Sequence, residues 1–486
     1  MVTDQKEIQV NSNDSLNDEQ RLQYEDTKQD LPSIYDIHTK FKKNVILFIV
    51  SGLGFLSNFD ELVYIPALSM VIQDLHTTET LSLSTITVYV LGSCFGGLIW
   101  GMLSDCYGRR SIMLLALCGF VLSVVGSYFS SNIHIFLVAR VLQGAFICVT
   151  TTVGQATIAD IYQPSERGRA IAFFYAFYFM ASIVGPIIGG PLSYHFGWRS
   201  TFIVVEILAI ILFILYVLFV PETQQYIIVC NCHKMGTKLL EYDLLVKPKL
   251  QNPCLALRYL KETTTLPYIF VLALGFMSMN VAQLSLSIQV SKAPYHYKSN
   301  VIGILYLPLA IAKFLGSIIG GILSDYAAIR YMTTFRIDEG HVVPALLFSV
   351  LTPIGLIIYG WSFQYGMHVS LPLIGLIICS FGQTGTRPGI YSFYTIKYQQ
   401  YSASVIAANN FVQLLLTSIM LAFTAIIVES IGNGVYFTTI AMGNILATIV
   451  PVIIISRKIR LSSNICEKMP SQSTPLIGTD AKQYHE

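Results

Sequence analysis

The sequence predicts an all-α integral membrane protein whose chain crosses the bilayer about twelve times. Two observations lead to this fold class. The chain has 486 residues, of which 53% are hydrophobic and only 12% charged, whereas about a quarter of the residues of a soluble domain are charged. The apolar residues also form long runs, and a helix needs about 20 mostly apolar residues to span a membrane. The mean hydropathy of +0.60 agrees with both.

The apolar runs are organised as six spans, a polar stretch and six further spans. Polar tails are expected over 1–43 and 457–486, and a loop rich in Lys and Arg over 221–264. Two six-helix bundles are therefore expected over 44–220 and 265–456. The twelve predicted spans are 44–66, 82–103, 111–129, 133–158, 168–192, 200–220, 265–290, 300–323, 341–361, 370–395, 402–428 and 434–456.

The distribution of Lys and Arg predicts the orientation of the chain. With the amino terminus inside the cell, 24 of the 30 Lys and Arg residues fall on the cytoplasmic side, 3 on the other side, and 3 within spans. Cytoplasmic loops carry an excess of these residues. Both termini are therefore expected in the cytoplasm, and the first 40 or so residues read as a disordered tail.

An internal repeat relates the two bundles. Residues 101–105 (Gly-Met-Leu-Ser-Asp) end the second span, and residues 321–325 (Gly-Ile-Leu-Ser-Asp) end the eighth. Upstream, Gly96 aligns with Gly316. Parallel repeats of this kind are typical of transporters in which the binding site lies between the repeats near the bilayer midplane.

The first copy of this repeat carries a family resemblance. Gly101-x-Leu103-Ser104-Asp105-x-x-Gly108-Arg109-Arg110 resembles the loop signature of the major facilitator superfamily. The resemblance implies the major facilitator fold, with twelve helices in two pseudo-symmetric bundles, and a gate formed by charge contacts. The gating residues that it implies are Gly101, Asp105, Gly108, Arg109, Arg110 and, in the second copy, Asp325.

Two further motifs resemble the same superfamily. Arg140-x-x-Gln143-Gly144 in the fourth span is similar to its second signature, and Gly185-Pro186-x-x-Gly189-Gly190 in the fifth to the signature of antiporters. Most of the chain also resembles fungal drug:proton antiporters of the quinidine-resistance type. The segments that carry this resemblance are 35–43, 64–68, 220–223 and 402–411. Because the first span reads Asn58-Phe59-Asp60-Glu61 where that branch often has small neutral polar residues, the substrate stays open.

Charged side chains inside the spans are the candidate functional groups. A charge at the bilayer centre costs about 2.5 to 3.5 kcal/mol on insertion scales, so such residues line a cavity, form pairs or reach the interface. Asp60, Arg140 and Glu206 lie about six or seven residues from the outer ends of their spans, about 9 Å deep for Asp60. We expect Asp60 to bind the proton, Arg140 to hold the pKa of Asp60 within reach, and Glu206 to serve as an alternative acceptor. A fixed ion pair that only orients helices is the competing interpretation.

Further polar groups are candidates for the substrate cavity. Lys313 and Arg387 would suit an anionic group, although Lys313 could instead reach a neighbouring carbonyl and Arg387 could belong to a gate. Interhelical hydrogen bonds explain the uncharged members equally well. The candidate cavity residues are Gln155, Asn280, Gln283, Lys313, Gln383, Arg387, Asn410 and Gln413.

Several function classes are disfavoured. The sequence has no phosphate-binding Gly-x-x-x-x-Gly-Lys-Ser/Thr motif, so an ATP-driven pump is not expected, and neither is an enzyme, a cofactor or a metal. Cys230 and Cys232 would supply only half of the ligands of a metal site. The simpler interpretation is that they are loop cysteines in a reducing cytosol. No basic patch interleaved with aromatic residues suggests a nucleic acid partner.

The expected function is a proton-coupled antiporter that exports small organic molecules such as drugs, organic cations or weak acids. It is expected to act as a monomer in the plasma membrane, with a vacuolar or other internal membrane as the alternative. A proton symporter or facilitator for a nutrient and a polyamine or amine exporter share the fold. A nutrient sensor that does not transport is the alternative from another class.

Overall fold

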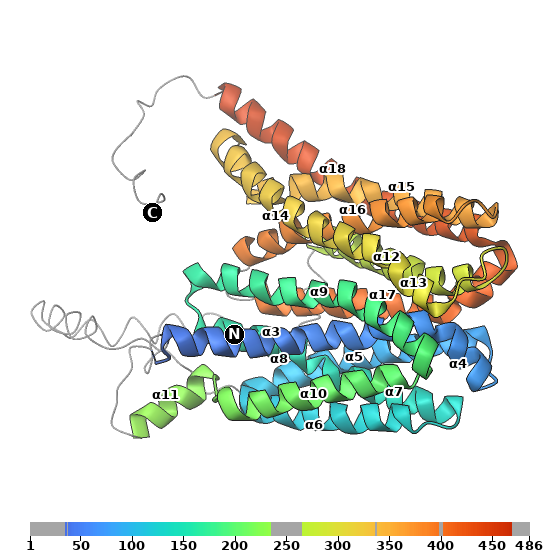
Figure 1. The fold of residues 1–486 in the computed structure, drawn as a ribbon. Coiled ribbons are helices and arrows are strands. Elements are labelled where there is room, and N and C mark those ends of the chain that lie inside the picture. Colours follow the sequence, from blue (N-terminus) through green and yellow to red (C-terminus); the bar gives the residue numbers. More distant parts are fainter. Residues whose placement is uncertain (1–34, 36, 235–264, 336–337, 398–401, 469–486) are drawn as a thin grey trace, which may run out of the picture. The chain divides into compact units, whose positions relative to one another are not determined.

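The computed structural model describes residues 35, 37–234, 265–335, 338–397 and 402–468. Most of both predicted tails and residues 235–264 of the predicted central loop lie outside the described residues. Within the described ranges the chain is almost entirely helical and contains no strand. Figure 1 shows this all-helical architecture.

The first half of the chain forms the helices that the apolar runs predict, with small differences at their ends. The elements are α3 (Lys40–Val63), the 3₁₀ turn η2 (Ile65–Ala67), α4 (Leu68–Asp74), α5 (Glu79–Tyr107), α6 (Arg109–Tyr128), α7 (Ile133–Ile147), α8 (Val149–Ile161), α9 (Pro164–Phe196), α10 (Ser200–Phe219) and α11 (Gln225–Lys234).

The second half repeats the pattern. Its elements are α12 (Leu266–Ser291), α13 (Ser299–Leu305), α14 (Leu307–Phe335), the 3₁₀ turn η4 (Asp338–His341), α15 (Val342–Gln364), α16 (Ser370–Lys397), α17 (Ser402–Ile431) and α18 (Asn433–Lys468). The fourth predicted span is divided at Cys148 into α7 and α8, and the eighth at Tyr306 into α13 and α14.

Eleven stretches in the described ranges are long and apolar enough to cross a membrane. The one predicted span without a counterpart among them is the tenth, 370–395, which corresponds to the 28-residue helix α16. Its inner half contains Gln383, Thr384, Thr386 and Arg387, and these polar residues lower its hydropathy. The fold class predicted from the sequence is confirmed: the chain is a multi-pass, all-α membrane protein.

Three differences from the predicted spans are larger. α14 continues past residue 323 to Phe335, and α18 continues through Arg457, Lys458 and Arg460 to Lys468. A search for apolar runs stops at the first cluster of polar and charged residues, whereas a helix continues wherever its backbone hydrogen bonds do. α11 is a separate short helix within the predicted central loop.

Local sequence signals set several helix ends. The hydroxyl of Thr78 accepts a hydrogen bond from the backbone of Leu81 and caps α5, and Asn132 caps α7 through the backbone of His134. α9 begins with Pro164, whose ring fixes a helical φ angle where no backbone donor is needed. α5 ends at Tyr107, and the residue that follows it, Gly108, has a φ of +99°, which glycine adopts without steric strain.

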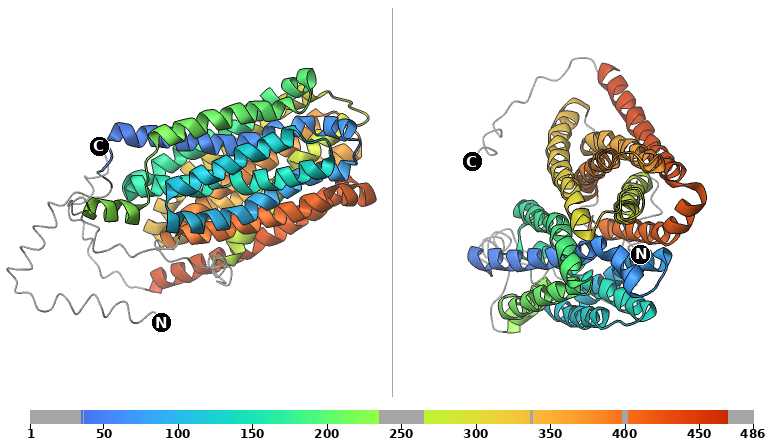
Figure 2. Two further views of the ribbon diagram at one scale, coloured as in Figure 1. Left: turned by 90° about the horizontal axis from the view of Figure 1, so that it is seen from below. Right: turned by 45° about the vertical axis from the view of Figure 1, so that its right-hand side comes forward.

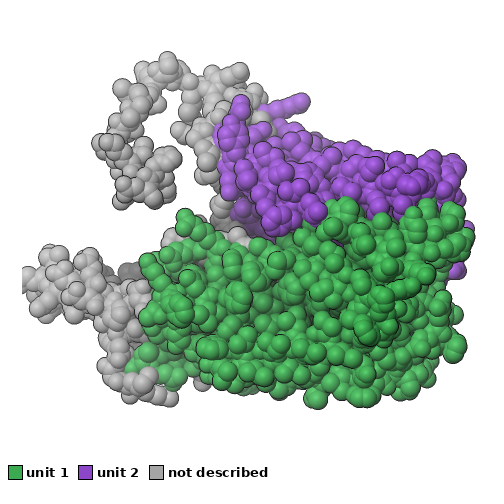
Figure 3. Space-filling model, viewed as in Figure 1, with its two compact units in different colours: residues 1–255, 286–310, 418–425 green, residues 256–285, 311–417, 426–486 purple. Residues whose placement is uncertain are grey.

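The described chain divides into two compact units (Figure 3). Unit 1 comprises residues 1–255, 286–310 and 418–425, and unit 2 comprises residues 256–285, 311–417 and 426–486. In unit 1, α3 packs against α9, α5 against α7, and α6 against α7 and α10. In unit 2, α15 packs against both α16 and α18. Figure 2 shows the same helices from two further directions.

The internal repeat has a packing counterpart in each unit. A side chain on Gly96 of α5 would collide with the backbone of Ala145 in α7, and one on Gly316 of α14 would lie 2.5 Å from the carbonyl oxygen of Phe381 in α16. Both glycines therefore let two helices approach closely in equivalent positions of the repeat.

Candidate functional site

Asp60 and Arg140 lie in a buried polar network inside unit 1. Asp60 is in the last turn of α3 and is 1% exposed, and Arg140 is in the middle of α7 and is 0% exposed. Arg140 Nη1 lies 3.9 Å from Asp60 Oδ1, at ion-pair but not hydrogen-bond distance. The two residues that the sequence placed at similar depths are thus neighbours in space.

Gln143 joins these two charges. Its Nε2 donates a hydrogen bond of 2.6 Å to Asp60 Oδ1, and its Oε1 accepts one of 3.1 Å from Arg140 Nη1. The hydroxyl of Ser127 on α6 also donates to Gln143 Oε1, at 3.1 Å. Arg140 and Gln143 are three residues apart on α7 and so share one face of the helix.

Aromatic rings surround the guanidinium of Arg140. Its Cζ lies 4.4 Å from the ring centroid of Tyr89, 5.2 Å from that of Tyr64 and 5.9 Å from that of Phe202. These cation–π contacts stabilise the charge of Arg140, whose side chain is not exposed to solvent. They also leave part of its donor capacity unused, since Arg140 Nε and Nη2 have no hydrogen-bond partner in the described chain.

The second oxygen of Asp60 is also without a partner: Oδ2 accepts no hydrogen bond from the described residues. A proton can therefore bind at Oδ2 without displacing the hydrogen bond that Gln143 makes to Oδ1. The arrangement offers a carboxylate that can gain and lose a proton beside an arginine that stays charged.

Glu206 does not join this network. It lies on α10 and is partly exposed, and no ion pair or hydrogen bond among the described residues connects it to Asp60 or Arg140. It follows the buried Val205 by one residue, which turns its side chain by about 100° around the helix. Equal depth in the membrane therefore does not bring it to the same face.

The loop motif between α5 and α6 forms a second cluster of charges in unit 1. Arg109 Nε donates to Asp160 Oδ2 at 3.0 Å, and Arg109 also pairs with Asp105. Arg110 donates to the carbonyl of Val217 at 2.7 Å. Gly101 lies in α5 with open space around its α-carbon, and the exposed Asp325 makes no ion pair with another described residue.

Glu222 is a member of this cluster to which the sequence gave no role. Its carboxylate accepts hydrogen bonds from the backbone nitrogens of Arg109 (2.8 Å) and Arg110 (3.2 Å), at the first turn of α6. It also accepts from the backbone of Thr223 and Gln224. A carboxylate at a helix N-terminus is stabilised by the unpaired N–H groups and the helix dipole. The Pro221-Glu222-Thr223 sequence directly after the sixth span was the available signal.

The glycines of the fifth-span motif are buried contact points of α9. A side chain on Gly189 would overlap the carbonyl oxygen of Val63 in α3, and one on Gly190 would lie 2.6 Å from the carbonyl oxygen of Ser299 in α13. Gly185 approaches Leu62 and Val63 on α3. The motif, with Pro186 inside the helix, thus packs α9 against α3 and α13 within unit 1.

Unit 2 contains most of the candidate cavity residues. Lys313 on α14 is 5% exposed and donates a hydrogen bond of 2.6 Å to Gln283 on α12. Arg387 on α16 donates one of 2.8 Å to Gln413 on α17, and its guanidinium lies 4.9 Å from the ring centroid of Phe276. Both cations therefore bind neutral amide oxygens in these contacts.

The remaining candidates differ in whether their amide groups form hydrogen bonds. Asn410 accepts a hydrogen bond from Tyr391, and Asn280 donates to the backbone of Phe276. Gln383 is 3% exposed, yet neither of its amide atoms has a partner in the described chain. Gln155, in unit 1, is partly exposed.

The structure gives no support for a metal site at Cys230 and Cys232. The described residues contain no group of three or more His, Cys, Asp or Glu side chains that could hold a metal ion. Both cysteines lie on α11, where Cys232 packs near the buried Val229.

Comparisons with known proteins agree with this architecture. The sequence model of the Major Facilitator Superfamily matches residues 50–421. The MFS antiporter QDR3 of Candida albicans is 22% identical over 82% of this chain and 75% of its own length. The MFS-type transporter MFS19 of Alternaria alternata is 30% identical over 76% of this chain and 79% of its own.

Solved structures show the same fold. The xylose transporter XylE of E. coli, in a partially occluded inward open conformation, has a TM-score of 0.63 at 14% identity and covers 84% of this chain and 98% of its own. The family match covers most of the spans, including the buried network of α3 and α7. The chain belongs to the Major Facilitator Superfamily.

Proposed function

We propose that this protein is a secondary active transporter that exports small organic molecules in exchange for protons. Its place in the superfamily makes it a multi-pass membrane transporter. The similarity to QDR3, which is named as an antiporter, supports export by antiport. We further propose that it acts as a monomer in the plasma membrane with both termini in the cytoplasm, as the distribution of Lys and Arg suggests.

One observation carries the proposal: Asp60 is buried beside Arg140 within the membrane-spanning part of unit 1. A carboxylate is expensive to keep in such a place and is rarely found there without a function. Gain of one proton by Asp60 changes the Asp60–Arg140 pair from neutral to singly positive, and loss of that proton reverses the change. Two unit charges about 4 Å apart attract each other by ~4 kcal/mol at an effective dielectric constant of 20.

This change in charge would reach other helices through α3. Asp60 lies three residues before Val63, the residue against which Gly189 of the antiporter motif packs. Tyr64, one residue further, has its ring against Arg140. A change in the attraction between α3 and α7 therefore acts on the helix that also carries the α9 contact, which is how proton binding would favour one conformation over another.

The substrate is proposed to meet the polar groups of unit 2. Lys313 and Arg387 are cationic groups within spans, and Gln383 has unused hydrogen-bonding capacity. Such groups suit molecules with an anionic group or several acceptors, which favours weak acids among the small organic molecules.

Efflux measurements test the proposal. Labelled weak acids and organic cations are loaded into cells that lack their own exporters, and efflux is followed with and without an imposed proton gradient. We expect the gradient to accelerate efflux in the wild type and to have no effect in Asp60→Asn. The matched control is Glu206→Gln, which removes a partly buried carboxylate outside the network and should retain gradient-driven efflux. Full gradient dependence in Asp60→Asn would refute the proposal.

A further inference from the structure

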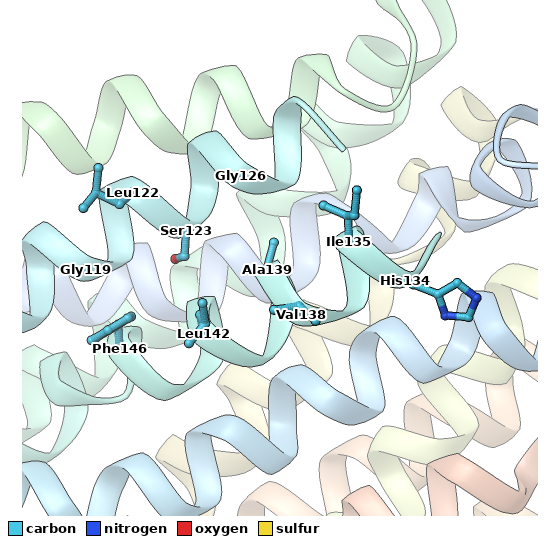
Figure 4. A pocket seen from close by; sticks show the side chains of 10 residues that line it. All are labelled: Gly119, Leu122, Ser123, Gly126, His134, Ile135, Val138, Ala139, Leu142 and Phe146. Atoms are coloured by element: carbon cyan, nitrogen blue, oxygen red, sulfur yellow. The ribbon is translucent and has the colours of Figure 1, made fainter. Parts of the chain in front are cut away.

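Unit 1 has a groove between α6 and α7 that the transport proposal does not use. It has a volume of about 630 Å³, within the usual range of ligand sites, and Figure 4 shows its side chains. From α6 it is lined by Gly119, Leu122 and Gly126, and from α7 by Val138, Leu142 and Phe146. Leu122 is 72% exposed and Val138 62% exposed, so the groove opens on a surface that faces the apolar membrane.

Two glycines form the floor of the groove. A side chain at Gly126 would touch only the β-carbon of Ala139, at 3.6 Å. At Gly119 the ring of Phe146 lies so close that an added β-carbon would be 2.6 Å from it. The groove is therefore flat beside Gly126 and bounded by an aromatic ring at Gly119.

The length of the groove matches one leaflet of a bilayer. His134, at the start of α7, lies at one end and Phe146 at the other (Figure 4). Twelve residues separate them, which corresponds to about 18 Å at helical rise. The hydrocarbon core of a bilayer is about 30 Å thick. A transmembrane helix would cross both leaflets, whereas this groove suits a molecule that occupies one.

The polar groups of the groove favour a neutral head. The hydroxyl of Ser123 already donates to the carbonyl of Phe120 at 2.6 Å. His134 is exposed, and no hydrogen bond of the described residues involves its imidazole ring. Residues 128–134 contain no Lys or Arg. Arg199, which donates to the carbonyl of Ser130 at 2.9 Å, is paired with Asp74. These residues therefore offer no unpaired Lys or Arg to bind a phosphate headgroup, whereas a hydroxyl can form a hydrogen bond with His134.

We propose that this groove binds a sterol-class lipid, with its hydroxyl at His134 and its ring system over Gly126. A rigid, flat ring system fits the surface beside Gly126, where the neighbouring side chains of Ser123 and Ala139 are small. It also loses little conformational freedom on binding, unlike a flexible acyl chain. The branched side chains of Leu122, Val138 and Leu142 supply the walls, and the ring of Phe146 receives the apolar end.

Photolabelling tests this proposal independently of transport. The purified full-length protein is reconstituted in phosphatidylcholine vesicles that contain a diazirine analogue of cholesterol, illuminated, and mapped by mass spectrometry. We expect labels on α6 and α7 along the groove, and competition by unlabelled cholesterol. Gly126→Leu fills the floor and should reduce this labelling about tenfold, which corresponds to ~1.4 kcal/mol. The control Val125→Leu changes the adjacent, exposed residue and should label like the wild type.

Substitutions of His134 test the proposed hydrogen bond to the sterol hydroxyl. His134→Phe should reduce labelling about two- to tenfold through loss of one hydrogen bond, and His134→Gln should restore it. Unchanged labelling in Gly126→Leu would overturn the proposal. Equal labelling of the groove by a phosphatidylcholine with a photoreactive acyl chain would show an unselective lipid surface and would likewise overturn the proposal. Cross-links between two copies of the chain would assign the groove to a dimer contact and would also overturn it.

Discussion

Gln143 donates a hydrogen bond of 2.6 Å to Asp60, from α7 to α3, while the nearest nitrogen of Arg140 stays 3.9 Å from the same oxygen. The buried carboxylate is thus held directly by a neutral amide and only at longer range by a cation. Gln143 therefore fixes the position of Asp60, and Arg140, which we propose tunes proton binding there, acts on the carboxylate without a direct hydrogen bond.

Removal of Arg140 should destabilise the protein strongly. Arg140→Met leaves the carboxylate of Asp60 buried without its counter-charge, and loss of one partner of a buried pair costs about 3–5 kcal/mol. We expect a clear fall in the temperature at which the detergent-purified protein aggregates. The double variant Asp60→Asn/Arg140→Met removes the orphaned charge and should recover part of the loss. If the double variant were less stable than Arg140→Met, the pair would not be coupled.

Removal of the bridging amide should have a smaller effect. Gln143→Leu deletes the hydrogen bond to Asp60 Oδ1 and the acceptor for Arg140, and a buried group left unsatisfied costs about 1–3 kcal/mol. The same thermal assay checks this. The control is Gln155→Leu, at a partly exposed position, which should change stability little. Equal losses in the two variants would show that Gln143 has no special role.

Hydropathy was sufficient to predict the fold because the bilayer imposes a length and a composition on every span. The span of α10, for example, was predicted as 200–220 and runs from Ser200 to Phe219. α16 was predicted correctly as a helix although its polar residues keep it outside a simple hydropathy criterion. α11 was missed because a ten-residue helix with polar residues leaves no apolar run.

The sequence predicted how deep the candidate site residues lie in the membrane but not which of them are in contact. Counting residues from the span ends placed Asp60, Arg140 and Glu206 at similar depth, but depth does not give the direction of a side chain. That direction depends on how each helix is rotated against its neighbours, which tertiary packing decides. Glu222 could not be placed for a related reason: its partners lie more than a hundred residues away, at the start of α6.

The glycines of the family motifs should differ sharply in their tolerance of substitution. Gly189→Ala puts a β-carbon into the carbonyl oxygen of Val63 and should abolish accumulation of folded protein. Gly101→Ala introduces the same β-carbon into open space and should be tolerated. Expression followed by size-exclusion chromatography compares the two variants. A well-folded Gly189→Ala protein would show that α3 and α9 can separate without loss of the fold.

Removal of the charge of Glu222 and removal of its whole carboxylate should destabilise the N-terminal end of α6 to different degrees. Its Oε1 accepts from the backbone of Arg109, and its Oε2 from that of Arg110. Glu222→Gln keeps one oxygen but loses the charge at the helix N-terminus, an effect of about 0.3–1 kcal/mol. Glu222→Ala loses every acceptor and should cost about 0.5–2 kcal/mol, as loss of a helix cap does.

Thermal stability in detergent should therefore fall from the wild type through Glu222→Gln to Glu222→Ala. Asp325→Asn is the matched control, because Asp325 is an exposed carboxylate within α14 and forms no ion pair with another described residue. It should match the wild type. If Glu222→Ala were as stable as Asp325→Asn, the backbone of Arg109 and Arg110 would be satisfied without Glu222.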